Sequence, residues 1–479
     1  MTNILIIAIY FISVLMVGHF FSGRSESMKD YFLAGRNMGW MMVGISVMVT
    51  SFSTLNFVSV TGEVFGHGLY VLLSVPMFFV VIYPVLKWFI PFYKTKNISS
   101  AYEYLEIRFD KSVRTAAGIM FILWKTVWMS VSLYAAGIAL SAVSSIPLPA
   151  VILLCGVTSL IYTVSGGMKA VMVTDMMQFI VIAVSLSAII IISVFTFDGS
   201  ISQLFEIVAN SGKLAPFSPF DSDILSASPD VRISIFSTFT GVTVAFLARY
   251  GVDQVVVQRY FSSKNESVMK KGIFLNAAAA VAVIASVAVF GLILKAYSIN
   301  NNVSGNFLQT LKMFMASLPS GVSGLLSAAL FAAMMSSIDS GINSCSCAFF
   351  TDIMPVIRKE SVFSITKARI VSLLIGTAAI IFAFPISKMG SVFETVNKVV
   401  NGMGAPLLAL FVCGSVIKRI DAKSALAGFI SGIVASILII TFVKGISLHY
   451  YAVINFIITF FLMIIFYVMN LIFSKFVRQ

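Results

Sequence analysis

The stretch FAAMMSSIDSGINSCS, residues 331–346, places several polar side chains inside a long apolar segment. Ser336, Asp339, Ser340 and Asn343 are spaced at i, i+3, i+4 and i+7. In a helix this spacing puts all four side chains on one face. A polar face of this width lines either a cavity or a contact between helices.

Serines alone have a simple interpretation, because small residues are common where membrane helices pack closely. We assign Ser344 and Ser346 to such packing. A carboxylate is different, since a charge at membrane depth is costly without a partner. No basic residue occurs between Phe331 and Ile357, so Asp339 predicts a bound cation.

Asp175, in VMVTDMMQF, is a second carboxylate in an apolar segment. It follows Lys169 by six residues, so an interfacial pair with that lysine is one interpretation. The other is a ligand for a hard cation such as sodium, since such ions prefer carboxylate, carbonyl and hydroxyl oxygens. The segments around Asp175 and Asp339 together offer this set of oxygens.

A third polar cluster lies in VTSFSTLNF, which contains Thr50, Ser51, Ser53, Thr54 and Asn56. Serine and threonine side chains can satisfy backbone groups that a helix leaves unpaired. Interrupted helices near the middle of a membrane present carbonyls to ions and helix ends to substrates. The cluster therefore predicts a broken helix at a binding site.

The composition shows what must position these residues. Of 479 residues, 59% are hydrophobic and only 11% are charged, whereas soluble domains are about 25% charged. Apolar runs of about 20 residues can cross a bilayer as helices, and continuous runs such as 179–195 exclude the alternating pattern of a β-barrel. We predict thirteen spanning segments, at about 3–22, 38–66, 70–93, 115–144, 147–165, 170–197, 232–258, 272–297, 323–352, 367–388, 391–416, 424–444 and 450–472.

The charges predict the orientation of these segments. Loops after odd-numbered segments and the C-terminal tail hold 22 basic residues, from Arg24 to Arg478, and the opposite loops hold about six. Because cytoplasmic loops are enriched in Lys and Arg, the N-terminus is expected outside and the C-terminus inside. The net charge of +13 is thus a topology signal and not a nucleic-acid surface. The four cysteines lie in apolar segments and are expected to be small buried hydrophobes.

The order of segments predicts an internal repeat. Segments 2–6 (31–198) and 7–11 (232–417) form two sets of five, and an odd number makes the second set begin on the opposite side of the membrane. That is the topology of an inverted repeat whose halves move about a central site. Residues 1–30 form a first helix and inside loop, 199–231 an outside loop, and 418–479 two further helices and a short cytoplasmic tail.

The chain also resembles a known family over nearly its whole length. The likeness to the sodium:solute symporters, which have the leucine-transporter fold of five plus five helices, lies in DYFLAGRNMGWMMVGIS (30–46), SSAYEYLEIRFDKSVR (99–114), YTVSGGMKAVMVTDMMQ (162–178), YGVDQVVVQRY (250–260) and AAMMSSIDSGINS (332–344). The second to fourth of these look most like the branch of iodide, multivitamin and monocarboxylate symporters, whose substrates are small anions.

The resemblance implies roles for particular residues. The carbonyls of Val49, Phe52 and Ala333 and the hydroxyls of Ser336 and Ser337 match the general sodium site of the family. An additional sodium site of some members matches Asp175, Ser336, Asp339 and Ser340, and the substrate-lining positions match Ser51, Ser53, Asn56, Phe78, Trp128 and Gln254.

The sequence departs from the family at several of these positions. Position 339 is often Ser in the family and is Asp here, which leaves open whether it holds a sodium ion or a proton. Asp253 replaces the usual Asn, and Phe78 and Trp128 replace residues that are polar in several sugar or acid transporters. Lys125, one turn from Trp128, either pairs with an anionic substrate or extends toward the membrane interface.

These features predict a sodium-coupled symporter of the cytoplasmic membrane, not an enzyme. We expect it to act as a monomer in the lipid bilayer and to import a small organic solute, most simply a monoanion. The alternatives are proton coupling on the same fold, a sugar or sialic-acid symporter, and an uncoupled channel.

Overall fold

A computed structural model describes residues 2–95, 98–144, 146–196, 201–210, 224–303, 305–357, 364–388, 392–443, 445–447 and 449–476. The regular secondary-structure elements within these ranges are all helices, joined by turns and short loops. The predicted all-α membrane architecture is confirmed. The first half contains α1 (Thr2–Phe21), α2 (Met28–Leu33), η1 (Ala34–Arg36), α3 (Trp40–Ser51), α4 (Thr54–His67), η2 (Leu69–Ser74), α5 (Val75–Pro84), η3 (Val85–Phe89), α6 (Ile90–Thr95), α7 (Glu103–Arg108), α8 (Lys111–Ser144), α9 (Leu148–Thr196) and α10 (Ile201–Asn210).

The second half repeats this mixture of long and interrupted helices. It contains α11 (Ile235–Ser237), η5 (Thr238–Val242), α12 (Thr243–Leu247), η6 (Ala248–Val252), α13 (Gln254–Phe261), α14 (Glu266–Asn300), α15 (Phe307–Ser317), α16 (Val322–Ala348), η7 (Phe349–Ile353), α17 (Met354–Ile357), α18 (Ile365–Ala383), η8 (Pro385–Lys388), α19 (Val392–Val416), α20 (Ala422–Phe442) and α21 (Tyr450–Phe476).

The number of membrane crossings agrees with the sequence once three features are considered. Among the described residues, 10 helices are long and apolar enough to span, and the bent pair α3 and α4 makes an eleventh. Helix α9 has 49 residues, about 74 Å at 1.5 Å per residue, which is more than two bilayer cores. Its chain breaks at Gly167, where φ is 61°, so it supplies two crossings. Helix α19, with its apolar part Met403–Val416, supplies the remaining one.

Two of the crossings are interrupted at the middle of the bundle. Helices α3 and α4 are bent by 61° across Phe52, which is extended (φ −109°, ψ 96°). Ser53 then begins α4 by exchanging hydrogen bonds with Asn56. The second interruption is at Asp253, also extended (φ −71°, ψ 115°), whose carboxylate accepts the N–H of Val255 and begins α13.

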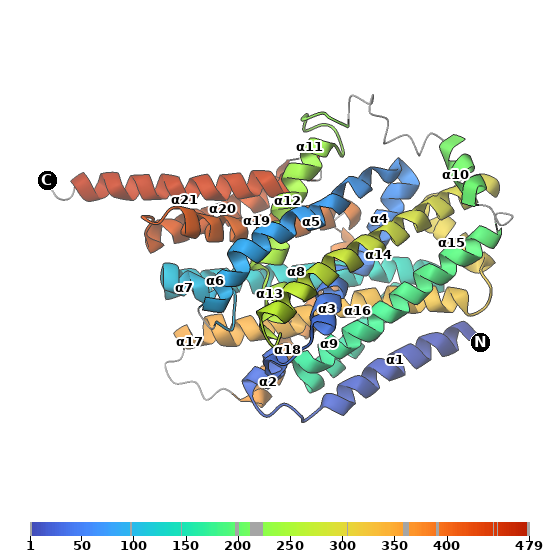
Figure 1. The fold of residues 1–479 in the computed structure, drawn as a ribbon, viewed down its shortest axis with the longest axis horizontal. Coiled ribbons are helices and arrows are strands. Elements are labelled where there is room, and N and C mark those ends of the chain that lie inside the picture. Colours follow the sequence, from blue (N-terminus) through green and yellow to red (C-terminus); the bar gives the residue numbers. More distant parts are fainter. Residues whose placement is uncertain are drawn as a thin grey trace.

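Helix α16 lies at the centre of the bundle. Every residue from Leu326 to Ala348 is buried, and α9, α8 and α1 pack along it. Figure 1 shows α16 running lengthwise among α8, α9 and α14. The polar stretch 331–346 is therefore enclosed by protein and does not face lipid.

The two ends of the chain lie at opposite ends of the long axis of the bundle, as an odd number of crossings requires (Figure 1). Helix α10 lies within the predicted outside loop 199–231 and contacts α14. Residues 211–223 of that loop and the tail residues 477–479 lie outside the described part of the chain.

The predicted orientation can be tested with single cysteines at the two ends of α14. Asn301 and Lys264 flank this helix and are exposed, whereas the four native cysteines are buried. In intact cells, Asn301→Cys should react with a membrane-impermeant maleimide, and Lys264→Cys should react only after the cells are permeabilised. The parent protein is the control and should not be labelled; the reverse pattern would invert the topology.

Candidate substrate cavity and cation sites

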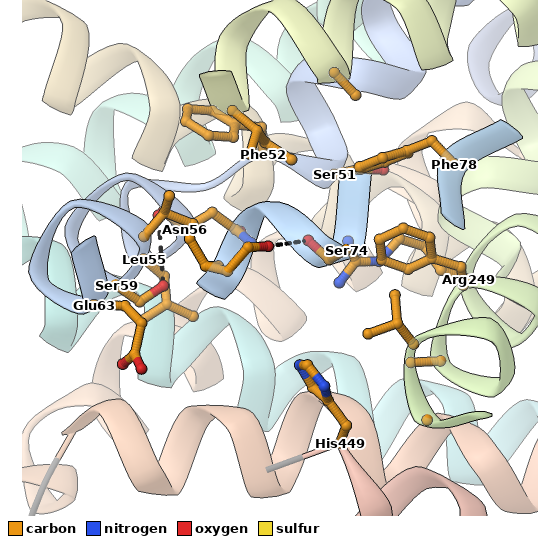
Figure 2. A pocket seen from close by; sticks show the side chains of 18 of the residues that line it. Ser51, Phe52, Leu55, Asn56, Ser59, Glu63, Ser74, Phe78, Arg249 and His449 are labelled. Atoms are coloured by element: carbon orange, nitrogen blue, oxygen red, sulfur yellow. Dashed lines mark hydrogen bonds between the residues drawn. The ribbon is translucent and has the colours of Figure 1, made fainter. Parts of the chain in front are cut away.

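A cavity of about 160 Å³ opens beside the break between α3 and α4. Its walls come from α3, α4, η2, α5, α8, η5, α12, η6 and α14, so segments from both predicted repeats enclose it. Figure 2 shows Ser51, Asn56 and Ser74 directed toward the same space as Phe78 and Arg249. The apolar part of the wall includes Phe52, Leu55, Phe78, Trp128, Phe246 and Tyr250.

Four of the predicted substrate residues line this cavity, namely Ser51, Asn56, Phe78 and Trp128. Ser53 lies at the break, and its side chain bonds Asn56 at 3.1 Å. Its geometry is that of a helix cap and not of a wall residue.

Gln254 is directed away from the cavity. Its side-chain oxygen accepts the backbone N–H of Ala101 at 2.8 Å, and its amide nitrogen lies 3.5 Å from the carbonyl oxygen of Ser99. The side chain therefore joins the start of α13 to the segment before α7.

Lys125 lines a smaller space of about 30 Å³ beside the main cavity, and Ser51, Trp128 and Arg249 border both. Its ammonium group pairs with the carboxylate of Asp253 at 2.5 Å. The same nitrogen lies 4.2 Å and 4.9 Å from the ring centres of Trp124 and Trp128. Both charges are buried, so each neutralises the other where α8 meets the break before α13.

Two charged side chains, those of Glu63 and Arg249, line the main cavity. Glu63 is neutralised by a two-pronged contact with Arg232, with both N–O distances at 2.8 Å. Arg249 borders the cavity, and no carboxylate among the described residues pairs with it. Figure 2 shows Glu63 and Arg249 on opposite sides of the cavity.

His449, from the loop between α20 and α21, also reaches the cavity wall (Figure 2). Burial lowers the pKa of its imidazole to about 4, although the nearby Glu63 carboxylate acts in the opposite direction. Its ring nitrogen Nδ1 lies 3.3 Å from the hydroxyl of Thr238. The imidazole is therefore neutral near pH 7, and the free positive charge of the cavity is on Arg249.

The structure brings together most of the predicted ligands of the general sodium site. The hydroxyl of Ser336 lies 3.2 Å from the carbonyl oxygen of Val49 and 3.0 Å from that of Ala333. The Ser337 hydroxyl lies 3.5 Å from the Thr50 carbonyl oxygen. The Val49 and Thr50 carbonyls belong to the last turn of α3, the negative end of the helix dipole, whereas that of Ala333 belongs to α16. This set of buried oxygens fits a hard cation, and Phe52 ends the same helix.

The residues of the predicted additional cation site have a different neighbour. The guanidinium of Arg259 lies 3.1 Å from Asp175 Oδ2 and 2.6 Å from the Ser46 hydroxyl. It also donates to the hydroxyl of Ser340 and to the Val255 carbonyl. Both charged side chains are fully buried, with 0% exposure each. From the sequence, Lys169 or a bound ion is expected as the partner of Asp175; in the structure the partner is Arg259.

Asp339 also has protein partners. The hydroxyl of Tyr162 donates to Asp339 Oδ2 at 2.6 Å, and that of Ser340 to Oδ1 at 3.0 Å. On the next turn, the Asn343 oxygen accepts from Gln258 at 2.9 Å. Ser346 donates to the Ala368 carbonyl, in agreement with a packing role, and the Ser344 hydroxyl has no partner among the described residues.

Sequence reasoning missed two arginines. Arg249 is a charged residue within the predicted spanning segment 232–258, a position that by itself marks a candidate functional site, but the sequence predicts no particular role for it. Arg259 was counted as a charge of an inside loop, because it lies near the predicted end of a segment. The sequence signal for Arg259 is indirect. Asp175 and Asp339 have no basic residue within their own predicted segments, so a basic residue that pairs with either of them must come from another part of the chain.

The fold and these sites are those of a membrane transporter with a central cavity and a cluster of buried oxygens that fits a cation. The profile of the "Sodium:solute symporter family" matches residues 31–432, and the chain belongs to that family. It is a multi-pass, sodium-coupled symporter and not an enzyme.

Curated relatives agree with this assignment. The chain is 31% identical to "Sodium/sialic acid symporter NanT" of Aliivibrio fischeri, over 95% of this chain and 90% of that protein. It is 28% identical to "Sodium-dependent multivitamin transporter" of Oryctolagus cuniculus, over 84% of this chain and 64% of that protein. The multivitamin and monocarboxylate branch is thus not favoured over the sialic acid symporters.

A solved structure supports the fold. The chain matches a Na⁺-coupled sialic acid symporter, described as a substrate-bound outward-open state with a novel Na⁺ site, at 27% identity and a TM-score of 0.86. The match covers 97% of both chains. The leucine-transporter fold of five plus five helices is therefore the fold of this protein.

The buried Asp175–Arg259 pair predicts a strong coupling in stability. Removing one member of a buried pair leaves an uncompensated charge and costs about 3–5 kcal/mol. We therefore expect Asp175→Asn and Arg259→Gln each to lower the thermal unfolding temperature in detergent strongly. The double variant should lose less than the sum of the two. Ser46→Ala serves as a control that removes two hydrogen bonds, one to each member of the pair, but no charge. Strict additivity of the two losses would contradict the coupling.

The oxygen cluster that matches the general sodium site predicts that two serines of α16 contribute to sodium affinity and that a third does not. Ser336→Ala and Ser337→Ala each remove one proposed oxygen ligand, so we expect the sodium concentration for half-maximal uptake to rise roughly tenfold, the equivalent of about 1.4 kcal/mol. Ser344→Ala is the matched control, because it removes a buried serine hydroxyl without a partner on the same helix. Equal sodium responses in all three variants would place the site elsewhere.

Proposed function

We propose that the protein imports a small organic monoanion together with sodium. The observation that carries this proposal is the charge of the main cavity. Its other ionic groups are neutralised, Glu63 by Arg232 and Lys125 by Asp253 in the adjoining space. Arg249 remains as a cation beside a partly apolar wall. A guanidinium in such a place is suited to a carboxylate, which it can bind through two parallel hydrogen bonds.

The size and the wall of the cavity support a small solute. A volume of about 160 Å³ is below the roughly 300–1,000 Å³ of sites for drug-sized ligands. Aromatic side chains such as Phe78, Trp128 and Phe246 form much of the surface. Such a wall suits the apolar body of a short-chain or aromatic acid better than the hydroxyls of a free sugar.

Sialic acid is the second candidate, because the named function of two relatives favours it. It is itself a carboxylate, so Arg249 is compatible with it. It differs in its size and in its many hydroxyl groups, which need more polar partners than Ser51, Asn56, Ser59 and Ser74 provide.

Coupling follows from the position of the sodium ligands. The proposed ligands Val49 and Phe52 come from the last turn and the end of α3, and Ser51, between them, borders the cavity. An ion held between this end and α16 would fix the broken helix in its present shape and thereby favour solute binding. This is coupling by differential affinity for two conformations of the protein.

Uptake into proteoliposomes tests the proposal. A thermal-shift screen in sodium with short-chain and aromatic monocarboxylates, vitamins that carry a carboxylate, sialic acid and hexoses first selects the solute. Its uptake is then measured under sodium and pH gradients imposed separately. We expect uptake to follow the sodium gradient; uptake driven by pH alone would favour proton coupling, and flux that neither gradient drives would favour a channel.

Arg249→Gln should raise the KM for the monoanion. Loss of a hydrogen bond to a charged group costs about 1.5–3 kcal/mol, or roughly 10–100-fold in affinity. Arg249→Lys keeps the charge and should retain most of the affinity, while sodium binding without solute should be unchanged in both. If Arg249→Gln transports as the parent does, or if a neutral sugar is the solute, the assignment of Arg249 is wrong.

A further inference from the structure

The positions that match an additional sodium site of the family surround an arginine in this chain. Asp175 (α9) and Ser340 (α16) both contact the Arg259 guanidinium, which reaches them from α13. Two further acceptors, the Ser46 hydroxyl at 2.6 Å and the Val255 carbonyl at 2.7 Å, hold it in place. Four helical elements of both repeats thus deliver ligands to one fixed cation.

These contacts make the group of residues unsuited to a second sodium ion. A hard cation binds through several oxygen lone pairs. Asp175 Oδ2 and the Ser340 hydroxyl already accept hydrogen bonds from Arg259, and both oxygens of Asp339 accept hydrogen bonds from Tyr162 and Ser340. Of the carboxylate oxygens of these two residues, Asp175 Oδ1 alone has no partner among the described residues, and one oxygen is too few to hold an ion. A guanidinium is permanently charged, so it would also repel a second cation placed among the same oxygens. The residues present therefore do not fit the additional sodium site.

The remaining charges balance with one sodium ion. The cluster contains two buried carboxylates, Asp175 and Asp339, and one buried cation, Arg259. Asp175 pairs directly with the arginine. Asp339 follows Ser336 by three residues on α16 and so lies one helical turn from the general sodium site. A single sodium ion at that site would supply the second positive charge.

We propose that Arg259 is a built-in cation that takes the place of a second sodium, and that each transport cycle is coupled to one sodium ion. This inference rests on sodium-coupled transport, and its electrical consequence rests on the proposed monoanion. One sodium ion with one monoanion carries no net charge, so uptake is electroneutral. Two sodium ions with one monoanion would carry one positive charge inward.

The parent protein in proteoliposomes gives the first test. The fluxes of ²²Na⁺ and labelled solute are measured together, and uptake is repeated with a potassium diffusion potential set by valinomycin. We expect a flux ratio of one and, for a monoanion, no response to the potential. A ratio of two overturns the inference, whereas uptake that ignores sodium overturns the proposed function instead.

Substitution of the arginine gives the second test, with sodium binding to the purified protein followed by tryptophan fluorescence and by equilibrium ²²Na⁺ binding. Arg259→Ala frees the oxygens of Asp175, Ser46 and Ser340, so we expect two bound sodium ions per protein in place of one. Arg259→Lys keeps the charge and should bind one. Adding Asp175→Asn to Arg259→Ala removes the freed carboxylate and should return the number to one.

The outcomes of this second test are separate from those of the first. If folded Arg259→Ala, judged by gel filtration and circular dichroism, still binds one sodium ion, Arg259 does not occupy a sodium site and the inference is wrong. If that variant does not fold, the flux ratio of the parent protein decides alone.

Discussion

The buried ion pair between Asp175 and Arg259 is the interaction on which the centre of this protein depends. Two charges removed from water are stable only if their contact is close and their other polar atoms are also bonded. Here Ser46, Ser340 and the Val255 carbonyl complete the contacts of the guanidinium. Ser46 also donates to Asp175 Oδ2, whereas Asp175 Oδ1 has no partner among the described residues. Because these groups belong to α3, α16 and α13, and Asp175 to α9, the pair requires four helical elements to keep their positions together.

The need of buried polar groups for bonding partners also explains how two helices can be broken inside a membrane. Backbone groups freed at a break must find partners, because lipid offers none. At the first break, Ser53 and Asn56 cap α4, and the Val49 carbonyl meets Ser336. At the second, Asp253 caps α13 and also neutralises Lys125. The breaks are thus polar structures closed by neighbouring helices, and the cavity lies between them.

The cavity combines neutralised charges with Arg249, a cation that has no anionic partner among the described residues. Pairs such as Glu63–Arg232 fix the positions of α4 and the segment before α11, and leave no net charge. Arg249 stands apart from them and so sets the sign of the potential that a solute meets. This distinction between structural pairs and the remaining cation supports the proposed anion preference. The identity of the anion is not determined by the fold, since sialic acid, multivitamin and monocarboxylate symporters all match this chain.

The membrane fold, the number of crossings, the broken helix at Thr50–Asn56 and the polar helix face within Phe331–Ser346 could all be predicted from the sequence alone. These follow from local properties: apolar length, the spacing of polar residues on one helix face, and motifs shared with the family. Tertiary structure decided which charge meets which. Asp175 and Arg259 are 84 residues apart, and Lys125 and Asp253 belong to different repeats. Hydrophobic periodicity carries no information on such contacts, because the pairing depends on how the folded repeats cross in space. For the same reason the sequence does not show that Gln254 is directed away from the cavity and that Arg249 lines it. The two residues are only five positions apart in the sequence.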